Sequence, residues 1–264
     1  MEHVEVAGLR VGFQRAGSGP PLVLLHGAVC DSRVWRLELN AFSDDYTVVA
    51  WDAPGCGSSD DPPETFRLGE YAQCLLAFIE ILGLGRPHVL GHSWGSGLAL
   101  ELYRQQPTVP ASLLLVGAYA GWAGSLPEAQ VAERLEFALR VADLACGEFD
   151  VVSMPGLFSE RMPSDRALEL ATIMADIRPA GTRAMARAFA EADLRDMLGD
   201  VRVPTLVLCG DADERSPRSV ASALHDALPI STLVVIPDAG HEVFFEKPEA
   251  ARDAVRTFLR SVTT

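Results

Sequence analysis

The sequence Gly-His-Ser-Trp-Gly at residues 91–95 constrains the fold more than any other stretch of the chain. A continuous apolar run precedes it, and a helix-forming run, residues 98–102, follows it. A serine at such a strand-to-helix corner has a strained backbone and an exposed hydroxyl. Gly91 and Gly95 let the strand and the helix pass close together. The motif makes Ser93 a candidate nucleophile, and an incidental turn serine is the alternative; an acid, a histidine and an oxyanion site in the right order would decide between them.

Length and composition limit the classes of protein that this chain can represent. Its 264 residues, 48% of them hydrophobic, fit one large domain or a domain with an inserted lid. No apolar run reaches the roughly 18 residues that a membrane span requires. The net charge is −14, with 36 acidic residues against 22 basic ones. Such a surface repels nucleic acid and anionic membranes, so we expect neither as a partner.

The N-terminus and the cysteines indicate the cellular compartment. Residues 1–5 are acidic and strand-like, without the basic start and apolar stretch of a secretory signal. The five cysteines are scattered and form no Cys-x-x-Cys pair. We therefore expect a reduced, cytoplasmic protein with neither a disulfide framework nor a zinc site. Nothing in these patterns predicts an oligomeric state.

Apolar runs typical of strands alternate with helical patterns along most of the chain. The pattern predicts strands over residues 3–6, 9–15, 21–25, 46–51, 87–90, 112–116, 205–209 and 232–236. Helices are expected over residues 31–42, 68–82, 94–106, 220–227 and 248–262. The first two strands suggest a hairpin. The rest of this order predicts an α/β fold, a mostly parallel sheet of about eight strands with helices on both faces.

Residues 121–195 interrupt this alternation, because they contain helical patterns and no buried-strand run. One interpretation is a helical excursion that only covers a sheet edge. The other is a helical lid (cap), inserted after the sixth strand, over the carboxyl ends of the strands, where open α/β sheets bind ligands. We favour the lid. The predicted core domain then comprises residues 1–120 and 196–264.

Two later loops, each following a strand, provide candidate partners for Ser93. His241 ends the Asp-Ala-Gly-His sequence at 238–241, and a histidine there can reach a serine beside a neighbouring strand. Asp211 and Asp213 compete for the acid that orients the histidine. Asp213 lies farther into its loop, where a side chain can turn toward the sheet, whereas Asp211 is suited to holding the loop. An exposed loop is the alternative for each, but the order serine, aspartate, histidine is the one that this kind of fold uses.

Two backbone amides can serve as oxyanion donors. The amide of Ala28 follows the strand at 21–25, and the amide of Trp94 follows Ser93. His26 could be mistaken for a catalytic base, but its place between a strand and a glycine suits a buried, hydrogen-bonded structural histidine. The Gly- and Pro-rich turn at 52–59 is interpreted as structural support for the same end of the sheet.

Taken together, these motifs resemble the α/β-hydrolase superfamily, in its branch of small lid-bearing serine esterases, lactonases and cofactor-free haloperoxidases. The resemblance rests on the turns at 26–27 and 52–59, the corner at 91–95, and the loops at 210–217 and 240–241. In that family the acid sits three residues after the glycine at 210, which favours Asp213. The tryptophan that follows Ser93 also resembles the haloalkane dehalogenases and epoxide hydrolases of the same superfamily. Those enzymes, however, use an aspartate nucleophile. A serine alkyl ether could not be hydrolysed as an ester is, so Ser93 disfavours their chemistry.

The resemblance implies hydrolysis of a small-molecule carboxylic ester or lactone through an acyl-enzyme, with no metal and no organic cofactor. Perhydrolysis, cleavage of a carbon–carbon bond on the same residues, and a slow ligand sensor remain alternatives. The sequence does not identify the acyl and alcohol groups. Several aromatic residues are candidates for an apolar substrate pocket, although each could equally belong to the core: Trp35, Tyr119, Trp122, Phe158 and Phe244.

Overall fold

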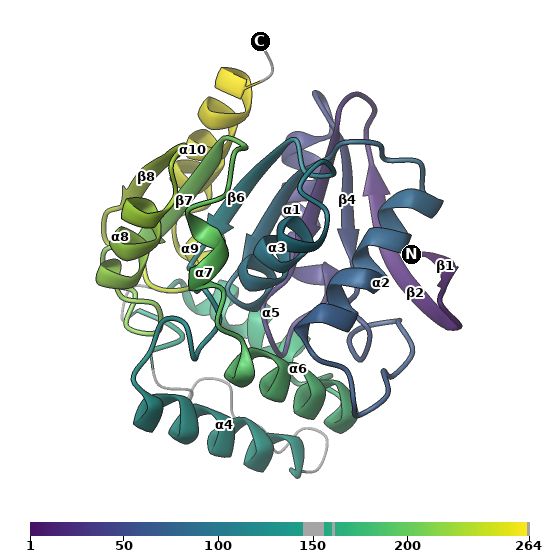
Figure 1. The fold of residues 1–264 in the computed structure, drawn as a ribbon, viewed down its shortest axis with the longest axis vertical. Helices are drawn as coiled ribbons and strands as arrows, with labels where there is room; N and C mark the ends of the chain where they lie inside the picture. Colours follow the sequence, from purple (N-terminus) through teal and green to yellow (C-terminus); the bar gives the residue numbers. More distant parts are fainter. Residues whose placement is uncertain (145–155, 160–161, 263–264) are drawn as a thin grey trace.

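The computed structural model describes residues 1–144, 156–159 and 162–262, and its strands form one sheet (Figure 1). The sheet has eight strands in the order β1-β2-β4-β3-β5-β6-β7-β8. β1 and β2 form an antiparallel hairpin, β2 pairs antiparallel with β4, and the other neighbours are parallel. This confirms the expected α/β fold class. The strands are β1 Glu2–Val6, β2 Leu9–Ala16, β3 Pro21–Leu25, β4 Thr47–Trp51, β5 His88–His92, β6 Ser112–Val116, β7 Thr205–Gly210 and β8 Ser231–Ile236.

Burial on both faces explains why the central strands are continuous apolar runs. Every residue of β5, β6 and β7 is buried, whereas the edge strand β8 is mostly half-buried. A parallel strand covered by helices on both sides has no solvent face to favour polar residues. The apolar runs therefore predicted these strands within about two residues of their ends.

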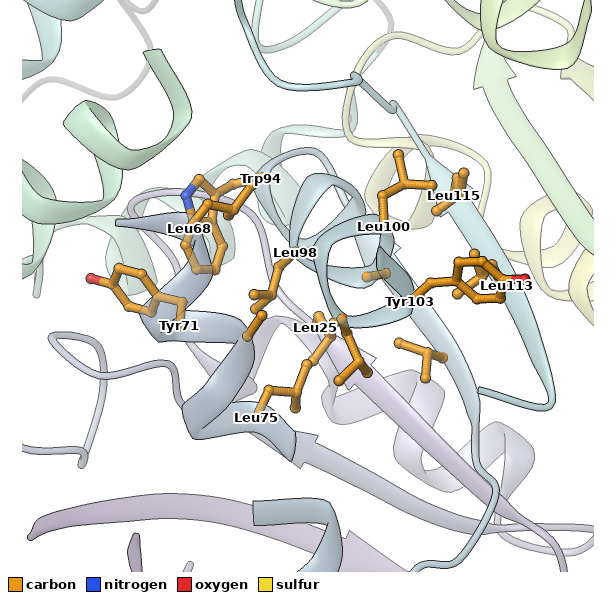
Figure 2. Close-up of a cluster of buried hydrophobic side chains, with 14 of the residues drawn as sticks. Leu25, Leu68, Tyr71, Leu75, Trp94, Leu98, Leu100, Tyr103, Leu113 and Leu115 are labelled. Atoms are coloured by element: carbon orange, nitrogen blue, oxygen red, sulfur yellow. The ribbon is translucent and has the colours of Figure 1, made fainter. Parts of the chain in front are cut away.

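Two layers of helices cover the sheet and enclose two hydrophobic clusters. One cluster draws Leu75, Leu98 and Leu224 from α2, α3 and α8, and Figure 2 shows its part between β3, α2, α3 and β6. The other draws Phe42 and Val255 from α1 and α10 on the opposite face. The helices are α1 Arg36–Phe42, α2 Leu68–Ile81, α3 Trp94–Gln105, α8 Arg218–Ala227 and α10 Pro248–Val262.

The described residues between β6 and β7 include three longer helices, α4 Glu128–Ala142, α5 Ser164–Met174 and α6 Pro179–Glu191. α4 packs against α6, and both lie beyond one end of the sheet (Figure 1). Residues 145–155 and 160–161 of the predicted lid fall outside the described part of the chain. The described part of residues 121–195 contains no strand, as expected.

Three short elements differ from the sequence-based expectation. The single helix expected over residues 31–42 is a 3-10 turn, η1 Ser32–Trp35, followed by α1, because Trp35 has the non-helical torsions φ −93° and ψ 8°. The four-residue helices α7 Arg195–Leu198 and α9 Val243–Glu246 were not predicted. One turn of helix is too short to give a periodic apolar pattern.

The described helices and cysteines bear on two further expectations. Within the described ranges, every helix falls short of the length and apolarity that a membrane span requires. The four cysteines in those ranges are free and buried, and Cys146 lies outside them. Burial raises the pKa of each of these four thiols, so they remain protonated at neutral pH. They act as small apolar side chains rather than as nucleophiles.

Candidate active site

The order of the strands determines where loops can converge. From β3 the chain runs to β4 on one side of it and then to β5 on the other side. Open α/β sheets bind ligands outside the carboxyl ends of the strands at such a reversal. The loops after β3 and β5 meet there, since a Cβ placed on Gly27 would lie 3.5 Å from Ser93 Cβ. Ser93 therefore lies at the reversal point of the sheet.

Ser93 has a strained backbone at the corner between β5 and α3. Its torsions are φ 51° and ψ −113°, a region that non-glycine residues rarely occupy. Its N–H donates to Val116 O at 2.8 Å. A Cβ on Gly91 would lie 2.2 Å from Gly95 O, and one on Gly95 would lie 2.4 Å from Leu25 O. Only glycine at both positions lets strand and helix approach closely enough to impose this conformation.

His241 and Asp213 form a buried pair. His241 Nδ1 lies 2.9 Å from Asp213 Oδ2, and both side chains are at most 2% exposed. The amides of Arg215 and Ser216 donate to Asp213 Oδ1 at 2.9 and 2.8 Å. Burial acts to raise the pKa of Asp213, but His241 and these amides outweigh it and hold the pKa below its ordinary value. Asp211 is exposed to solvent.

The ionised Asp213 carboxylate can only accept a hydrogen bond, so it fixes the tautomer of His241. Nδ1 carries the proton, and Nε2 retains a lone pair. His241 and Ser93 line the same cavity, so the basic nitrogen and the hydroxyl share one space. The three residues that the sequence indicated come from three loops, after β5, β7 and β8.

The amides of Ala28 and Trp94 are available as donors. Trp94 is the first residue of α3, where the N–H groups have no acceptor within the helix. Ala28 is half-buried in the cavity wall, and neither amide donates to another group among the described residues. Val29, beside Ala28, has φ 55°, which is costly for a β-branched residue. Such strain gathers at functional sites, and it affects both Val29 and Ser93.

The cavity has a volume of about 390 Å³, which is within the range of small-molecule sites. Ala28, Ser93 and His241 line it from the loops of the sheet. Arg134 of α4 and Met185 of α6 line it from the helices between β6 and β7. The reacting groups therefore lie between the carboxyl end of the sheet and these helices.

Only one of the five aromatic candidates, Trp122, lines this cavity. Trp35 and Phe244 pack edge to face, with ring centroids 5.2 Å apart, and line a smaller neighbouring cavity. Tyr119 is 1% exposed and packs against Phe189, and Phe158 packs against the second hydrophobic cluster. Four of the five aromatic candidates therefore lie outside the wall of the cavity that contains Ser93.

His92 and Glu242 form a second buried polar group beside His241. His92 Nε2 donates to His241 O at 3.0 Å, and His92 Nδ1 lies 4.0 Å from Glu242 Oε2. Burial lowers the pKa of His92, which favours neutral imidazole. Ligand atoms of His92, His241 and Glu242 all lie within 4.8 Å of one another, so they could hold a metal ion. No sequence pattern indicated this group in advance, although His92 lies in the corner motif and Glu242 follows His241.

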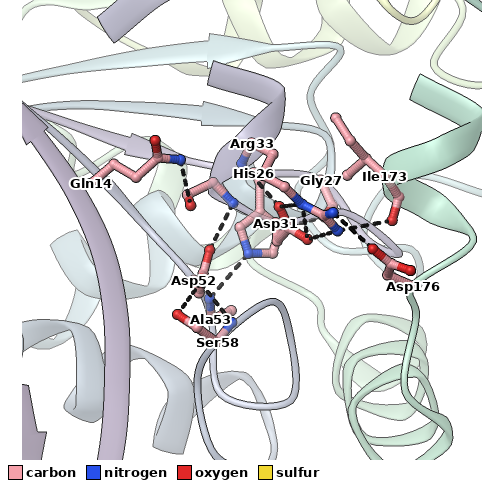
Figure 3. A network of polar contacts seen from close by, with 11 residues as sticks. Gln14, His26, Gly27, Asp31, Arg33, Asp52, Ala53, Ser58, Ile173 and Asp176 are labelled. Carbon is pink, nitrogen blue, oxygen red and sulfur yellow. Dashed lines mark hydrogen bonds and ion pairs between the residues drawn. The ribbon is translucent and has the colours of Figure 1, made fainter. Parts of the chain in front are cut away.

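His26 belongs to a structural network under the site (Figure 3). Its Nε2 accepts from the Ala53 amide at 3.0 Å, and its Nδ1 lies 2.7 Å from Gly27 O. Asp52 accepts from the amides of Ser32 and Ser58, each at 2.8 Å. These bonds tie the loop after β3 to the loop after β4, and so position Ala28. The interpretation of His26 as a buried, hydrogen-bonded structural residue is confirmed.

Comparison with known proteins identifies the family to which a chain with this fold and this site belongs. A family model described as the alpha/beta hydrolase family matches residues 22–254. The chain therefore belongs to the alpha/beta hydrolase family.

Its relatives include hydrolases that act on different bonds. An (E)-2-((N-methylformamido)methylene)succinate hydrolase of Acinetobacter baylyi is 27% identical over 93% of this chain and 92% of its own length. A proline iminopeptidase of Heyndrickxia coagulans is 26% identical over 98% of each chain. A thermophilic esterase of Thermogutta terrifontis, solved with malate, is 29% identical with a TM-score of 0.92 over the whole of both chains. The chain is a hydrolase of this family.

Proposed function

We propose that the protein hydrolyses a small-molecule carboxylic ester or lactone through an acyl-enzyme intermediate. The observation that carries this proposal is the strained Ser93 in one cavity with His241, whose Nδ1 is bound to a buried Asp213 at 2.9 Å. A carboxylate that fixes a histidine tautomer beside an exposed hydroxyl is the arrangement that activates a serine. The likeness to an esterase over the whole chain supports an ester as the substrate.

The proposed reaction has two halves. Ser93 Oγ attacks the carbonyl carbon while His241 Nε2 takes the hydroxyl proton, and the protonated imidazole is stabilised by Asp213. Collapse of the tetrahedral intermediate breaks the bond to the alcohol oxygen, which receives that proton. Water then attacks the Ser93 ester with His241 as general base, which releases the acid and restores the serine. In a lactone, the alcohol and the acid remain in one molecule.

The amides of Ala28 and Trp94 are proposed to stabilise the oxyanion of both tetrahedral intermediates. Both are free to donate, and the Trp94 amide also lies at the positive end of α3. Each donor in such a site contributes about 3 kcal/mol to the stability of the transition state. Because the contributing groups are backbone amides, substituting either side chain tests packing rather than this interaction.

We also propose that residues 121–195 are a lid (cap) over a core of residues 1–120 and 196–264. The support is that residues of α4 and α6 line the cavity opposite Ser93. A volume of about 390 Å³ suits a small or medium acyl group rather than a long chain. Covering the site in this way excludes water and strengthens the electrostatic interactions inside it.

The test compares wild-type protein with Ser93→Ala and with Ser43→Ala, a serine at the end of α1, on short p-nitrophenyl esters. Ser93→Ala should fold normally and lose turnover by about 10⁴-fold or more, while Ser43→Ala keeps it. A fluorophosphonate should add one label, located on Ser93 by peptide mass analysis. Retained turnover in folded Ser93→Ala would refute the proposal. Labelling with at most one turnover would instead indicate a ligand sensor.

A further inference from the structure

Arg134 is an arginine of the cavity wall that has no acidic partner among the described residues. Across the described residues it takes part in no ion pair, although the chain contains 36 acidic residues. Arg140, on the same helix, pairs with Glu136, and Arg183 of α6 pairs with Asp143. In a chain of net charge −14, a guanidinium that faces a cavity without an acidic partner among the described residues can bind an anion there.

The Arg134 guanidinium is held in place by groups that leave its charge uncompensated. Nη1 donates to Tyr119 Oη at 2.9 Å, and Nη2 donates to the backbone oxygen of Arg215 at 2.8 Å. Its carbon lies 5.7 and 5.9 Å from the ring centroids of Tyr119 and Trp122. A guanidinium has five N–H donors, so these two bonds leave three without a partner among the described residues. The guanidinium is therefore held in place while three of its N–H groups can still donate to a ligand.

Three carboxylates also line the cavity and limit where an anion can lie. Glu133 and Glu214 are exposed, so water screens them, while Glu242 is buried beside His92. Burial lowers the pKa of the Arg215 guanidinium, and the charge of Glu242 is among those that oppose this effect. Arg140, which also lines the cavity, is paired with Glu136, whereas Arg134 has no acidic partner among the described residues. An anion is best placed against Arg134, beside Trp122.

We propose that Arg134 binds a carboxylate of the substrate, so that the substrate class is a half-ester: a dicarboxylic acid with one carboxyl esterified and the other free. A planar carboxylate matches the free donors of a guanidinium better than a neutral group does. The inference rests on the proposed function, since it places the esterified carboxyl at Ser93. Its binding step does not depend on turnover, so the two ideas can be tested separately.

The binding experiment uses Ser93→Ala, which keeps the cavity without the nucleophile. Calorimetry with glutarate as the probe should detect binding that falls about 10- to 100-fold in Ser93→Ala/Arg134→Met. Methionine is chosen because it retains an apolar chain over the two rings while it removes the charge. Binding that is absent, or equal in the two proteins, overturns the inference whether or not the wild-type protein is an esterase.

The kinetic experiment compares mono-p-nitrophenyl glutarate with the neutral p-nitrophenyl pentanoate. Arg134→Met should raise KM for the glutarate ester about 10- to 100-fold, and Arg134→Lys should restore part of this loss. KM for the pentanoate should change by less than about threefold. Arg183→Met is the matched control, because it removes one positive charge of α6 and its ion pair with Asp143 at the end of α4, and Arg183 does not line the cavity.

The outcomes separate the two ideas. A loss confined to the glutarate ester supports carboxylate binding by Arg134. Equal losses on both esters would mean that Arg134 only ties α4 to the loop at Arg215, and a loss equal to that of Arg183→Met would mean a general charge effect. Either result overturns the inference while leaving ester hydrolysis intact.

Discussion

Replacing Ser93 with glycine is expected to stabilise the protein while abolishing its activity. The torsions of Ser93, φ 51° and ψ −113°, cost a residue with a Cβ about 1–3 kcal/mol. Glycine removes that strain but raises the entropy of the unfolded chain by about 0.5–1 kcal/mol. The bonds that hold the corner, such as Ser93 N–H to Val116 O, are backbone bonds and remain. The free energy of unfolding should rise by up to about 2.5 kcal/mol, which corresponds to a Tm increase of up to about 10 °C.

The assay is denaturant unfolding followed by circular dichroism, with Ser93→Ala and Ser43→Gly as controls. Alanine keeps the Cβ and therefore the strain, so Ser93→Ala should unfold close to the wild-type midpoint. Ser43 has the ordinary helical torsions φ −66° and ψ −18°, so glycine there should lower stability by about 0.5–1 kcal/mol. If Ser93→Gly is no more stable than Ser93→Ala, the backbone at this corner is not strained and the reasoning is wrong.

Three further predictions concern the neighbouring groups. Asp213→Asn should lower kcat by up to about 10⁴-fold in ester assays with little change in fold, and near-normal turnover would contradict its role in orienting His241. Zn²⁺ should inhibit reversibly by binding His92, His241 and Glu242; inhibition that EDTA does not reverse, or that Glu242→Gln does not weaken, would contradict this site. The pKa values of His26 and His92 are lowered by burial, so the unfolded state binds more protons below pH 6.5. Stability should therefore fall as pH drops from about 6.5, by up to about 1.4 kcal/mol per pH unit for each histidine, and a flat urea-unfolding profile between pH 6.5 and 5 would refute it.

Much of the sheet was predictable because its strands are buried on both faces. The run Ser112–Val116 coincides with β6, and Pro21–Leu25 coincides with β3. In both, burial forces a continuous apolar sequence, and the flanking turns end it abruptly. The break at Trp35 was not predictable, because the change from a 3-10 turn to an α-helix depends on backbone torsions that no periodic pattern records.

The candidate site was predictable in its loops but not in its walls. Ser93, Asp213 and His241 follow strands, so the parallel topology brings them to one edge. Composition could not distinguish Trp122, which lines the cavity, from the other four aromatic candidates, because a large ring serves a core and a pocket equally well. Arg134 was missed for a related reason: its partners, Tyr119 and Arg215, are 15 and 81 residues away in the chain.

The close approach of α6 to α3 imposes a compatibility rule on any exchange of the segment between β6 and β7. A Cβ at Gly97 would lie 2.4 Å from Cε2 of Phe189, a contact that real atoms do not make. The residues at 97 and 189 therefore share one volume and are constrained as a pair. A chimera that imports a foreign helical segment needs a ring at position 189 to fill this space. Conversely, a side chain larger than hydrogen at position 97 requires a smaller residue at 189.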